Sequence, residues 1–193
     1  MGELIKSIYA GLMIGIGGTI YLSIENKILG AILFSFGLLT IIIQGFNLYT
    51  GRVGYDIKNP PLMFKILIGN TIGTFICALL VRLSKPEIIN KANQIWLNKL
   101  NQTALSTLVL AVLCGVLMYL AVDNYKKNNN LLFIMLPVII FILSGYEHSI
   151  ANLFYLFLCN NIKVNQLWYI IICILGNSIG ARLFHIFKTN KGE

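Results

Sequence analysis

The sequence has 193 residues, of which 57% are hydrophobic and only 11% are charged, and its mean hydropathy is +0.78. Because about a quarter of the residues in a soluble domain are charged, this composition excludes an ordinary soluble protein. A formal net charge of +8 would suit a nucleic-acid partner, but the basic residues are spread along the chain with no patch interleaved with aromatic residues. We therefore expect no nucleic-acid partner.

Six apolar stretches follow one another along the chain. Most approach the roughly 20 residues that a helix needs to cross a hydrocarbon core of about 30 Å. The stretches are 7–24, 28–48, 62–83, 104–122, 131–158 and 167–187. The fifth is too long for one straight span, so we expect it to tilt or break. The pattern predicts an all-α membrane protein, with one polytopic domain over residues 1–193, no cleavable signal peptide and no soluble module.

The basic residues that flank these stretches indicate the orientation of the chain. With a cytoplasmic N-terminus, the inner set is Lys6, Arg52, Lys58, Lys65, Lys126, Lys127, Arg182, Lys188 and Lys191, and the outer set is Lys27, Arg82, Lys85, Lys91, Lys99 and Lys163. The larger inner set predicts N- and C-termini on the cytoplasmic side of the cytoplasmic membrane. Segment 84–103 carries three of the outer lysines, so it is either a positive outer vestibule that concentrates anions or an ordinary solvated loop. His185 is expected to be a solvated residue at the membrane interface.

The two halves of the chain share motifs. Ile68-Gly-Asn-Thr-Ile-Gly-Thr74 matches Leu175-Gly-Asn-Ser-Ile-Gly-Ala181, and Gln44-Gly-Phe-Asn-Leu48 matches Ser144-Gly-Tyr-Glu-His148. Each half, about 1–83 and 104–187, then holds three spans, and an odd number of spans turns the second copy upside down. Inverted repeats with interrupted helices predict a transport path at the repeat interface. The expected breaks are in the second and fifth helices, at Gly45, Gly51 and Gly54 on one side and at Gly145 on the other.

The third and sixth spans carry glycines and an asparagine at matching places. The glycines of Gly69-x-x-x-Gly73 and Gly176-x-x-x-Gly180 favour close helix packing. Asn70 and Asn177 either tie the broken segments or contact a solute. The four cysteines show no C-x-x-C spacing, so they predict buried free thiols rather than a disulfide framework or a metal site.

An acid and an imidazole lie side by side in the middle of the fifth apolar stretch. Glu147 and His148 belong to Gly145-Tyr-Glu-His-Ser-Ile-Ala-Asn-Leu-Phe154. A carboxylate at the centre of a membrane helix costs about 3 kcal/mol, so ionisable groups there usually face a cavity, a pore or a partner. The pair predicts either a passage or a buried polar lock. For Glu147 alone, a structural acid that satisfies the backbone of the broken helix is the favoured interpretation.

Together these motifs resemble the formate/nitrite transporter family. The features that carry the resemblance are Leu48-Tyr-Thr-Gly51, Gly69-Asn70, Leu136-Pro137 at the opening of the fifth span, the 145–154 motif and Gly176-Asn177. The resemblance covers essentially the whole chain. It implies an aquaporin-like protomer, a homopentamer with one pore per protomer, and passage of small monovalent anions such as formate, nitrite or hydrosulfide, linked to protons, across a lipid bilayer.

The resemblance also implies site residues and no catalytic residue, metal or cofactor. The central residues are His148, Thr50 and Asn177, and the constrictions are Phe34 and Leu38 toward one side and Phe141 toward the other, with Leu48 and Tyr49 beside Thr50. Separately from the resemblance, we expect Glu147, Asn70 and Asn152 to give structural support. Two positions depart from the family pattern. A Cys-Asn pair of the fourth span is Cys114-Gly115 here, which removes a polar side chain expected near the pore centre, and Tyr49 stands where phenylalanine is common.

Two mechanisms fit these residues. In the first, the anion loses its water between Phe141 and Leu38 and crosses as the neutral acid, with His148 as the donor of a proton or a hydrogen bond. In the second, a protonated His148 pairs with the anion. An unperturbed imidazole has a pKa of about 6.5, which allows either mechanism. Two other classes remain open: a neutral-solute pore of aquaporin type, although no paired Asn-Pro-Ala motif occurs, and an integral-membrane enzyme.

Overall fold

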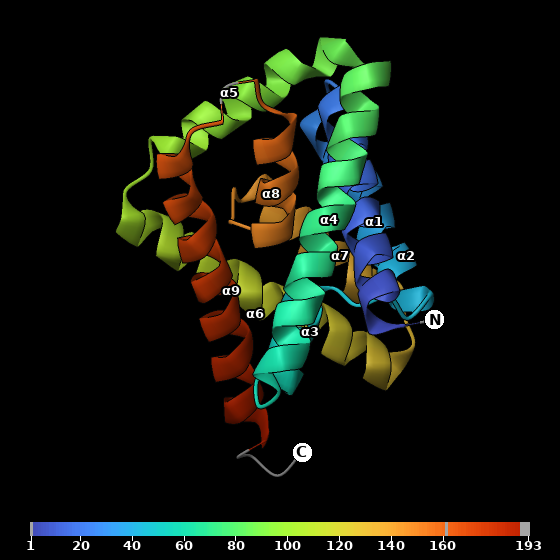
Figure 1. Cartoon of the computed structure of the whole chain (residues 1–193). Coiled ribbons are helices and arrows are strands. Elements are labelled where there is room, and N and C mark those ends of the chain that lie inside the picture. The colour runs from blue at the N-terminus through green and yellow to red at the C-terminus, as the bar shows by residue number, and fades with distance from the viewer. Residues whose placement is uncertain (1, 161, 190–193) are drawn as a thin grey trace.

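The computed structural model describes residues 2–160 and 162–189, so Lys191 lies outside the described residues. Within these ranges the chain forms helices and no strand (Figure 1). The α-helices are α1 (Glu3–Ser23), α2 (Lys27–Ile43), α3 (Tyr49–Asp56), α4 (Pro60–Ser84), α5 (Ile89–Leu100), α6 (Ala104–Asn128), α7 (Leu132–Leu143), α8 (Ser149–Leu158) and α9 (Leu167–Thr189). Two short 3₁₀ turns, η1 (Pro86–Ile88) and η2 (Val164–Gln166), precede α5 and α9.

The helices α1, α4, α6 and α9 are long and apolar enough to cross a membrane by length and composition. The second and fifth apolar stretches each break into two shorter helices, α2–α3 and α7–α8. The chain turns at Gly45 (φ +64°) and Gly145 (φ +68°), in the left-handed region that glycine adopts without steric cost. Gly51 and Gly54 lie inside α3 rather than at the break, so the prediction that they interrupt the span is wrong.

Short polar side chains begin several of these helices. Asn26 accepts from the backbone N–H groups of Ile28 and Leu29, and Thr103 accepts from that of Ser106. Such caps satisfy N–H groups that have no partner inside the helix. Pro137 lies inside α7 rather than at its opening, which corrects the position expected from the sequence.

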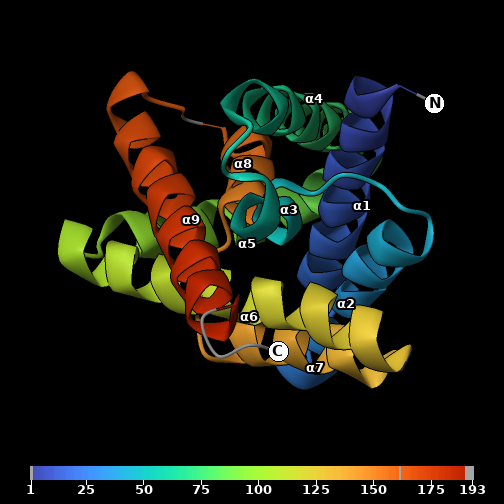
Figure 2. The same ribbon diagram turned by 90° about the horizontal axis from the view of Figure 1, so that it is seen from below.

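The long helices pack in pairs, α1 against α4 and α6 against α9, and the short helices α3 and α8 lie between them (Figure 2). A Cβ atom at Gly73 would lie 2.0 Å from the carbonyl oxygen of Ile8, and one at Gly180 would lie 2.0 Å from that of Val112. The backbones of each pair therefore touch where the glycines lie. This confirms the packing interpretation of the glycine motifs.

Segment 84–103 is not an ordinary solvated loop, and its residues Lys99 and Gln102 line a cavity that also reaches His148. It contains α5, which runs across one end of the helical bundle (Figure 1). Trp96 of α5 is 2% exposed, packs edge-on against Tyr169 and donates from Nε1 to Gln166 Oε1 at 3.0 Å. Of the two alternatives, the solvated loop is wrong, because this helix turns an apolar face toward the bundle that its lysines obscure in the sequence.

Candidate functional site

Two buried asparagines hold the ends of the broken helices. The Asn70 Oδ1 atom accepts from the backbone N–H of Tyr49 at 2.8 Å, and its Nδ2 donates to the carbonyls of Ser7 and Asn47. Asn177 makes the corresponding bonds in the other half, from Ser149 N–H and to the carbonyls of Ala111 and Glu147. Backbone groups freed by a break need partners in a membrane, and each amide supplies three.

These bonds decide between the two interpretations of the asparagines. Asn70 and Asn177 are both 0% exposed, and both amide groups are engaged with backbone. In this structure they tie the broken segments and present no free donor to a solute. A Cβ atom at Gly115 would lie 2.2 Å from the carbonyl oxygen of Asn177, so position 115 faces the backbone of α9 and has no room for the asparagine of the family pattern.

The N-terminal ends of α3 and α8 meet at a pair of buried side chains. Thr50 Oγ1 lies 2.9 Å from His148 Nε2, and the two residues are 0% and 2% exposed. His148 Nδ1 accepts from the backbone N–H of Ala151 at 3.1 Å. Because Nδ1 is the accepting nitrogen, a neutral ring carries its hydrogen on Nε2 and donates it to Thr50. The threonine hydroxyl hydrogen is then available to another acceptor.

A cavity of about 240 Å³ opens beside His148 on the side of α5. Phe34 and Phe141 line it together, with ring centroids 6.0 Å apart, and Phe141 stacks on the His148 ring at 5.4 Å. The two phenylalanines therefore stand on the same side of the histidine. This corrects the sequence expectation that placed Phe34 with Leu38 on one side and Phe141 on the other.

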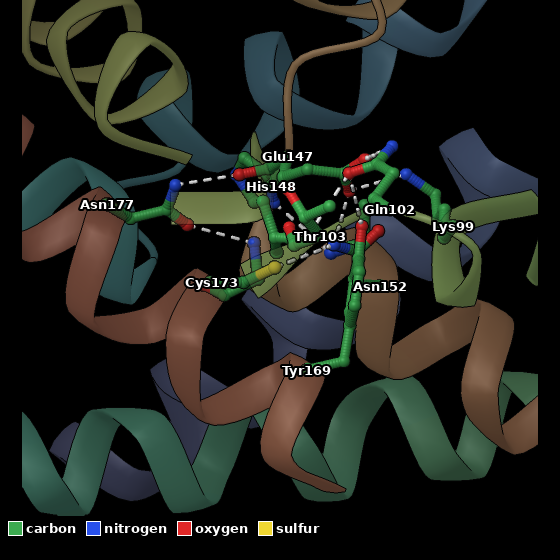
Figure 3. Close-up of polar contacts among 12 residues, drawn as sticks. Lys99, Gln102, Thr103, Glu147, His148, Asn152, Tyr169, Cys173 and Asn177 are labelled. Atoms are coloured by element: carbon green, nitrogen blue, oxygen red, sulfur yellow. Dashed lines mark hydrogen bonds and ion pairs between the residues drawn. The ribbon is translucent and has the colours of Figure 1, made fainter. Parts of the chain in front are cut away.

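Glu147 lies in the same cavity at the centre of a polar network (Figure 3). Its carboxylate is 1% exposed and accepts from Lys99 Nζ at 2.5 Å, Gln102 Nε2 at 3.1 Å and Asn152 Nδ2 at 2.8 Å. The acid thus holds side chains of α5, of the turn after it and of α8. The backbone of the break is held by Asn177, so the prediction that the Glu147 carboxylate satisfies that backbone is wrong.

A second cavity, of about 330 Å³, lies at the break between α2 and α3. Leu38 and Leu48 line it, together with the ion pair of Arg52 Nε and Asp56 Oδ2 at 2.5 Å. Arg52 also donates to the side chain of Asn47 at 2.8 Å. Since Phe34 and Leu38 are four residues apart on α2, the two cavities approach each other within about one helical turn.

Tyr49 lines neither of these two cavities among the described residues. Its ring borders a third, open cavity of about 360 Å³ with Met63 and Phe64 of α4 and Ser178 of α9. Its hydroxyl lies 2.9 Å from Ser178 Oγ. The side chain therefore points toward α9 rather than toward Leu38.

A polar cluster at the ends of α3, α6 and α9 was not foreseen. Asp123 accepts from Tyr55 at 3.2 Å and from Tyr119 at 3.5 Å, and pairs with Lys188. The Tyr119 hydroxyl lies 3.2 Å from His185 Nδ1. The expectation of a solvated His185 is corrected, because its ring packs edge-on against both tyrosines. The four-residue spacing of Tyr119 and Asp123 at the end of an apolar run was the available signal.

Paired broken helices around a buried histidine, enclosed by long apolar helices, define a multi-pass membrane protein built like a channel. The family model for the formate/nitrite transporter matches residues 2–188. This chain belongs to the formate/nitrite transporter family.

Among its relatives, the formate channel FocA of Escherichia coli (strain K12) is 31% identical over an alignment of 182 positions. The match covers 77% of this chain and 62% of that protein. The formate-nitrite transporter of Plasmodium malariae is 26% identical over an alignment of 233 positions. The match covers 95% of this chain and 74% of that protein. The chain thus spans less than two thirds of the FocA length. These relatives are channels and transporters rather than enzymes, in agreement with the expectation from the sequence.

Two solved structures share the fold. A pentameric formate channel with formate bound aligns with a TM-score of 0.85 at 23% identity, covering 94% of this chain and 92% of that one. An FNT family ion channel aligns with a TM-score of 0.82 at 22% identity, covering 99% and 88%. The helical architecture of a formate/nitrite channel is therefore present in this chain.

Proposed function

We propose that this protein passes a small monovalent anion, such as formate, nitrite or hydrosulfide, across the cytoplasmic membrane. The observation that carries the proposal is the buried contact of Thr50 with His148. His148 lines the cavity beside α5, and Leu48, two residues before Thr50, lines the cavity at the break between α2 and α3, so a path between the two cavities would pass this donor pair. Formate is the first candidate, since it is the substrate in the names of several relatives. In this proposal the assembly is a homopentamer, like the pentameric formate channel whose fold it shares, and each protomer holds its own pore.

The spans are six in this proposal: α1, α2–α3, α4, α6, α7–α8 and α9, arranged as two inverted repeats. The matching bonds of Asn70 and Asn177 support this arrangement, because equal contacts at equal places indicate one unit used twice. The termini are cytoplasmic, which puts the cavity beside α5 outside and the cavity with Arg52 inside.

Two apolar closures then bound the central pair. The outer closure is Phe34 with Phe141, and the inner closure is Leu38 with Leu48. An anion that enters between them loses its hydration shell, and an isolated charge in such surroundings is very costly. Narrow apolar points also exclude water, so they slow the passage of hydrated ions.

The proton linkage rests on His148. Its Nδ1 accepts from the N–H of Ala151, so protonation at Nδ1 would break the side-chain cap at the start of α8. This supports the mechanism in which His148 is neutral at rest and the hydroxyl of Thr50 donates a hydrogen bond to the entering anion. A proton that His148 takes up only transiently then passes to the anion, which crosses as the neutral acid while His148 returns to the neutral form. The competing mechanism, a stable imidazolium that pairs with the anion, needs that bond to be given up.

The test is a transport panel in proteoliposomes between pH 5 and 8. We expect uptake of formate, nitrite and hydrosulfide in competition with one another, with rates that rise as the outer pH falls because each anion needs a proton, supplied at His148, in order to cross. Water flux without anion uptake would identify a neutral-solute pore instead, and chemical turnover of an added substrate would identify an enzyme. Either outcome would contradict the proposal.

A further inference from the structure

Tyr49 is the residue between Leu48, which lines the inner cavity, and Thr50, which contacts His148. Its backbone N–H is held by Asn70 of α4. Its side chain is 8% exposed and reaches in another direction, to Ser178 of α9. The start of α3 is thus held from two helices at once, by its backbone and by its side chain.

The direction of the side-chain bond follows from the partners of Ser178. The Ser178 hydroxyl donates to the carbonyl of Ile174 at 2.6 Å, so its only hydrogen is already used. Tyr49 must therefore be the donor in the 2.9 Å contact, and Ser178 the acceptor. Both hydroxyls are engaged, and Ser178 is fixed to its own helix, which makes it a rigid anchor.

The other half of the chain has no such anchor. Ser149 follows Tyr49 by 100 residues and likewise donates its N–H to an asparagine, but its Oγ is buried without a hydrogen-bond partner in the described chain. Thr71 precedes Ser178 by 107 residues, and its hydroxyl donates within its own helix to Leu67. The backbone tie is therefore common to both breaks, whereas the side-chain tie is particular to the first.

We propose that Tyr49 is a positioning residue, whose hydroxyl, anchored on Ser178, fixes the start of α3 and thereby sets where Leu48 and Thr50 stand in the passage. This rests on the proposed function. The helix that it anchors has 8 residues, too few to be stable alone in the absence of tertiary contacts. The loss of one net hydrogen bond changes an equilibrium between held and released states by roughly fivefold.

The experiment is a double-mutant cycle in the full-length protein. Tyr49→Phe and Ser178→Ala each remove one end of the bond and keep the rest of the side chain. In proteoliposomes we expect each to lower the ratio of formate uptake to lactate uptake by about threefold to tenfold, because Leu48 and Thr50 are no longer held in place. The double variant should lower it no further, since one bond is lost in all three. Ser178→Thr keeps the hydroxyl and should restore the wild-type ratio.

Thr71→Ala is the matched control, because it removes a hydroxyl at the corresponding place that ties no other helix. Its uptake ratio should equal that of the wild type. Hydrogen exchange of the amides of α3 gives a second readout that needs no transport: Tyr49→Phe should speed exchange in α3 and leave α8 unchanged. If Tyr49→Phe keeps the wild-type ratio and the wild-type exchange, or if the two single effects add, the anchoring role is wrong. A wild-type protein that takes up no anion would instead contradict the proposed function, while the exchange measurement would still decide the role of Tyr49.

Discussion

The two junctions where a short helix meets a pair of long helices differ in chemistry, but each packs a large ring against glycine. At the junction of α8 with α1 and α4, a Cβ atom at Gly15 would lie 2.6 Å from Cys77, and Gly15 and Gly18 lie against the ring of Phe154. At the junction of α3 with α6 and α9, the large ring is Tyr119, and the glycine that it packs on is Gly54. The large residue has moved from the short helix to the long one.

This exchange shows what the packing requires. Gly15 and Tyr119 are 104 residues apart, and Phe154 follows Gly54 by 100, so each pair occupies corresponding places in the two halves. A close-packed interior fixes the sum of the volumes across a contact rather than the residue on either side. The packing of a short helix against two long ones does not require polar side chains, because apolar groups close the junction of α8. The Asp123 cluster at the α3 junction is therefore an addition to the fold and not a condition for it.

The largest effect is expected at the asparagine ties, which the two halves share. Asn70→Ala leaves the N–H of Tyr49 and the carbonyl of Asn47 without this partner. Asn177→Ala does the same to the N–H of Ser149 and the carbonyl of Glu147, and each buried group costs about 1–3 kcal/mol. Both variants should lose several kcal/mol of stability and most of their pentamer yield, and by similar amounts. Thermal unfolding in detergent measures this, with Thr71→Ala as the control. If one of the two variants kept the stability of the wild type, the two halves would not depend on their asparagines in the same way.

The next effect concerns the buried acid beside His148. Lys99→Met leaves the Glu147 carboxylate without its cation, which costs about 3–5 kcal/mol for a buried pair. Lys99→Met combined with Glu147→Gln should recover much of this, because no uncompensated charge then remains. A double variant as unstable as Lys99→Met would show that the lysine acts through packing and not through the charge of Glu147.

The two apolar closures should respond alike to widening. Phe141→Ala and Leu38→Ala each shorten the dry path, so uptake of a larger anion such as lactate should rise about tenfold relative to formate. Ile171→Ala, at a residue that is 56% exposed on α9, is the control and should change neither rate. Unchanged selectivity in both pore variants would mean that the passage runs elsewhere.

The smallest effect is expected at the polar junction. Asp123→Asn removes the charge that Lys188 pairs with, and the two side chains are only 13% and 17% exposed. We expect a loss of about 2 kcal/mol, because the pair is mostly buried but asparagine keeps an oxygen that accepts from Tyr55 and Tyr119. A loss as large as that at the asparagine ties would mean that the fold depends on the cluster, against the comparison of the two junctions.

Much of the backbone was predictable from the sequence. The Gly-Asn motifs and the glycines at 45 and 145 indicated the two breaks, because left-handed turns and buried amides leave a clear residue pattern. The resemblance places Thr50 and His148 together at the centre, and the two side chains lie within hydrogen-bond distance in the structure.

Three-dimensional neighbours were not predictable in the same way. Phe34 and Phe141 share one side because α2 and α7 pack together, which no spacing within either helix reveals. The sequence does not reveal that Lys99 is paired, because its partner Glu147 lies 48 residues further along the chain. The Tyr119 cluster joins three helices whose contacts depend on tertiary packing alone.

The most direct test of the central claim is the pH dependence of formate uptake by His148→Asn in proteoliposomes. Asparagine keeps a hydrogen-bonding group of similar size, but it takes up no proton between pH 5 and 8. We predict a flattened or shifted pH profile, with pentamer yield and thermal stability close to those of the wild type, and a strong loss of uptake in His148→Phe, which has no donor. An assembly that collapses in His148→Asn, with a wild-type pH profile in the fraction that survives, would make the histidine a structural lock and contradict the account.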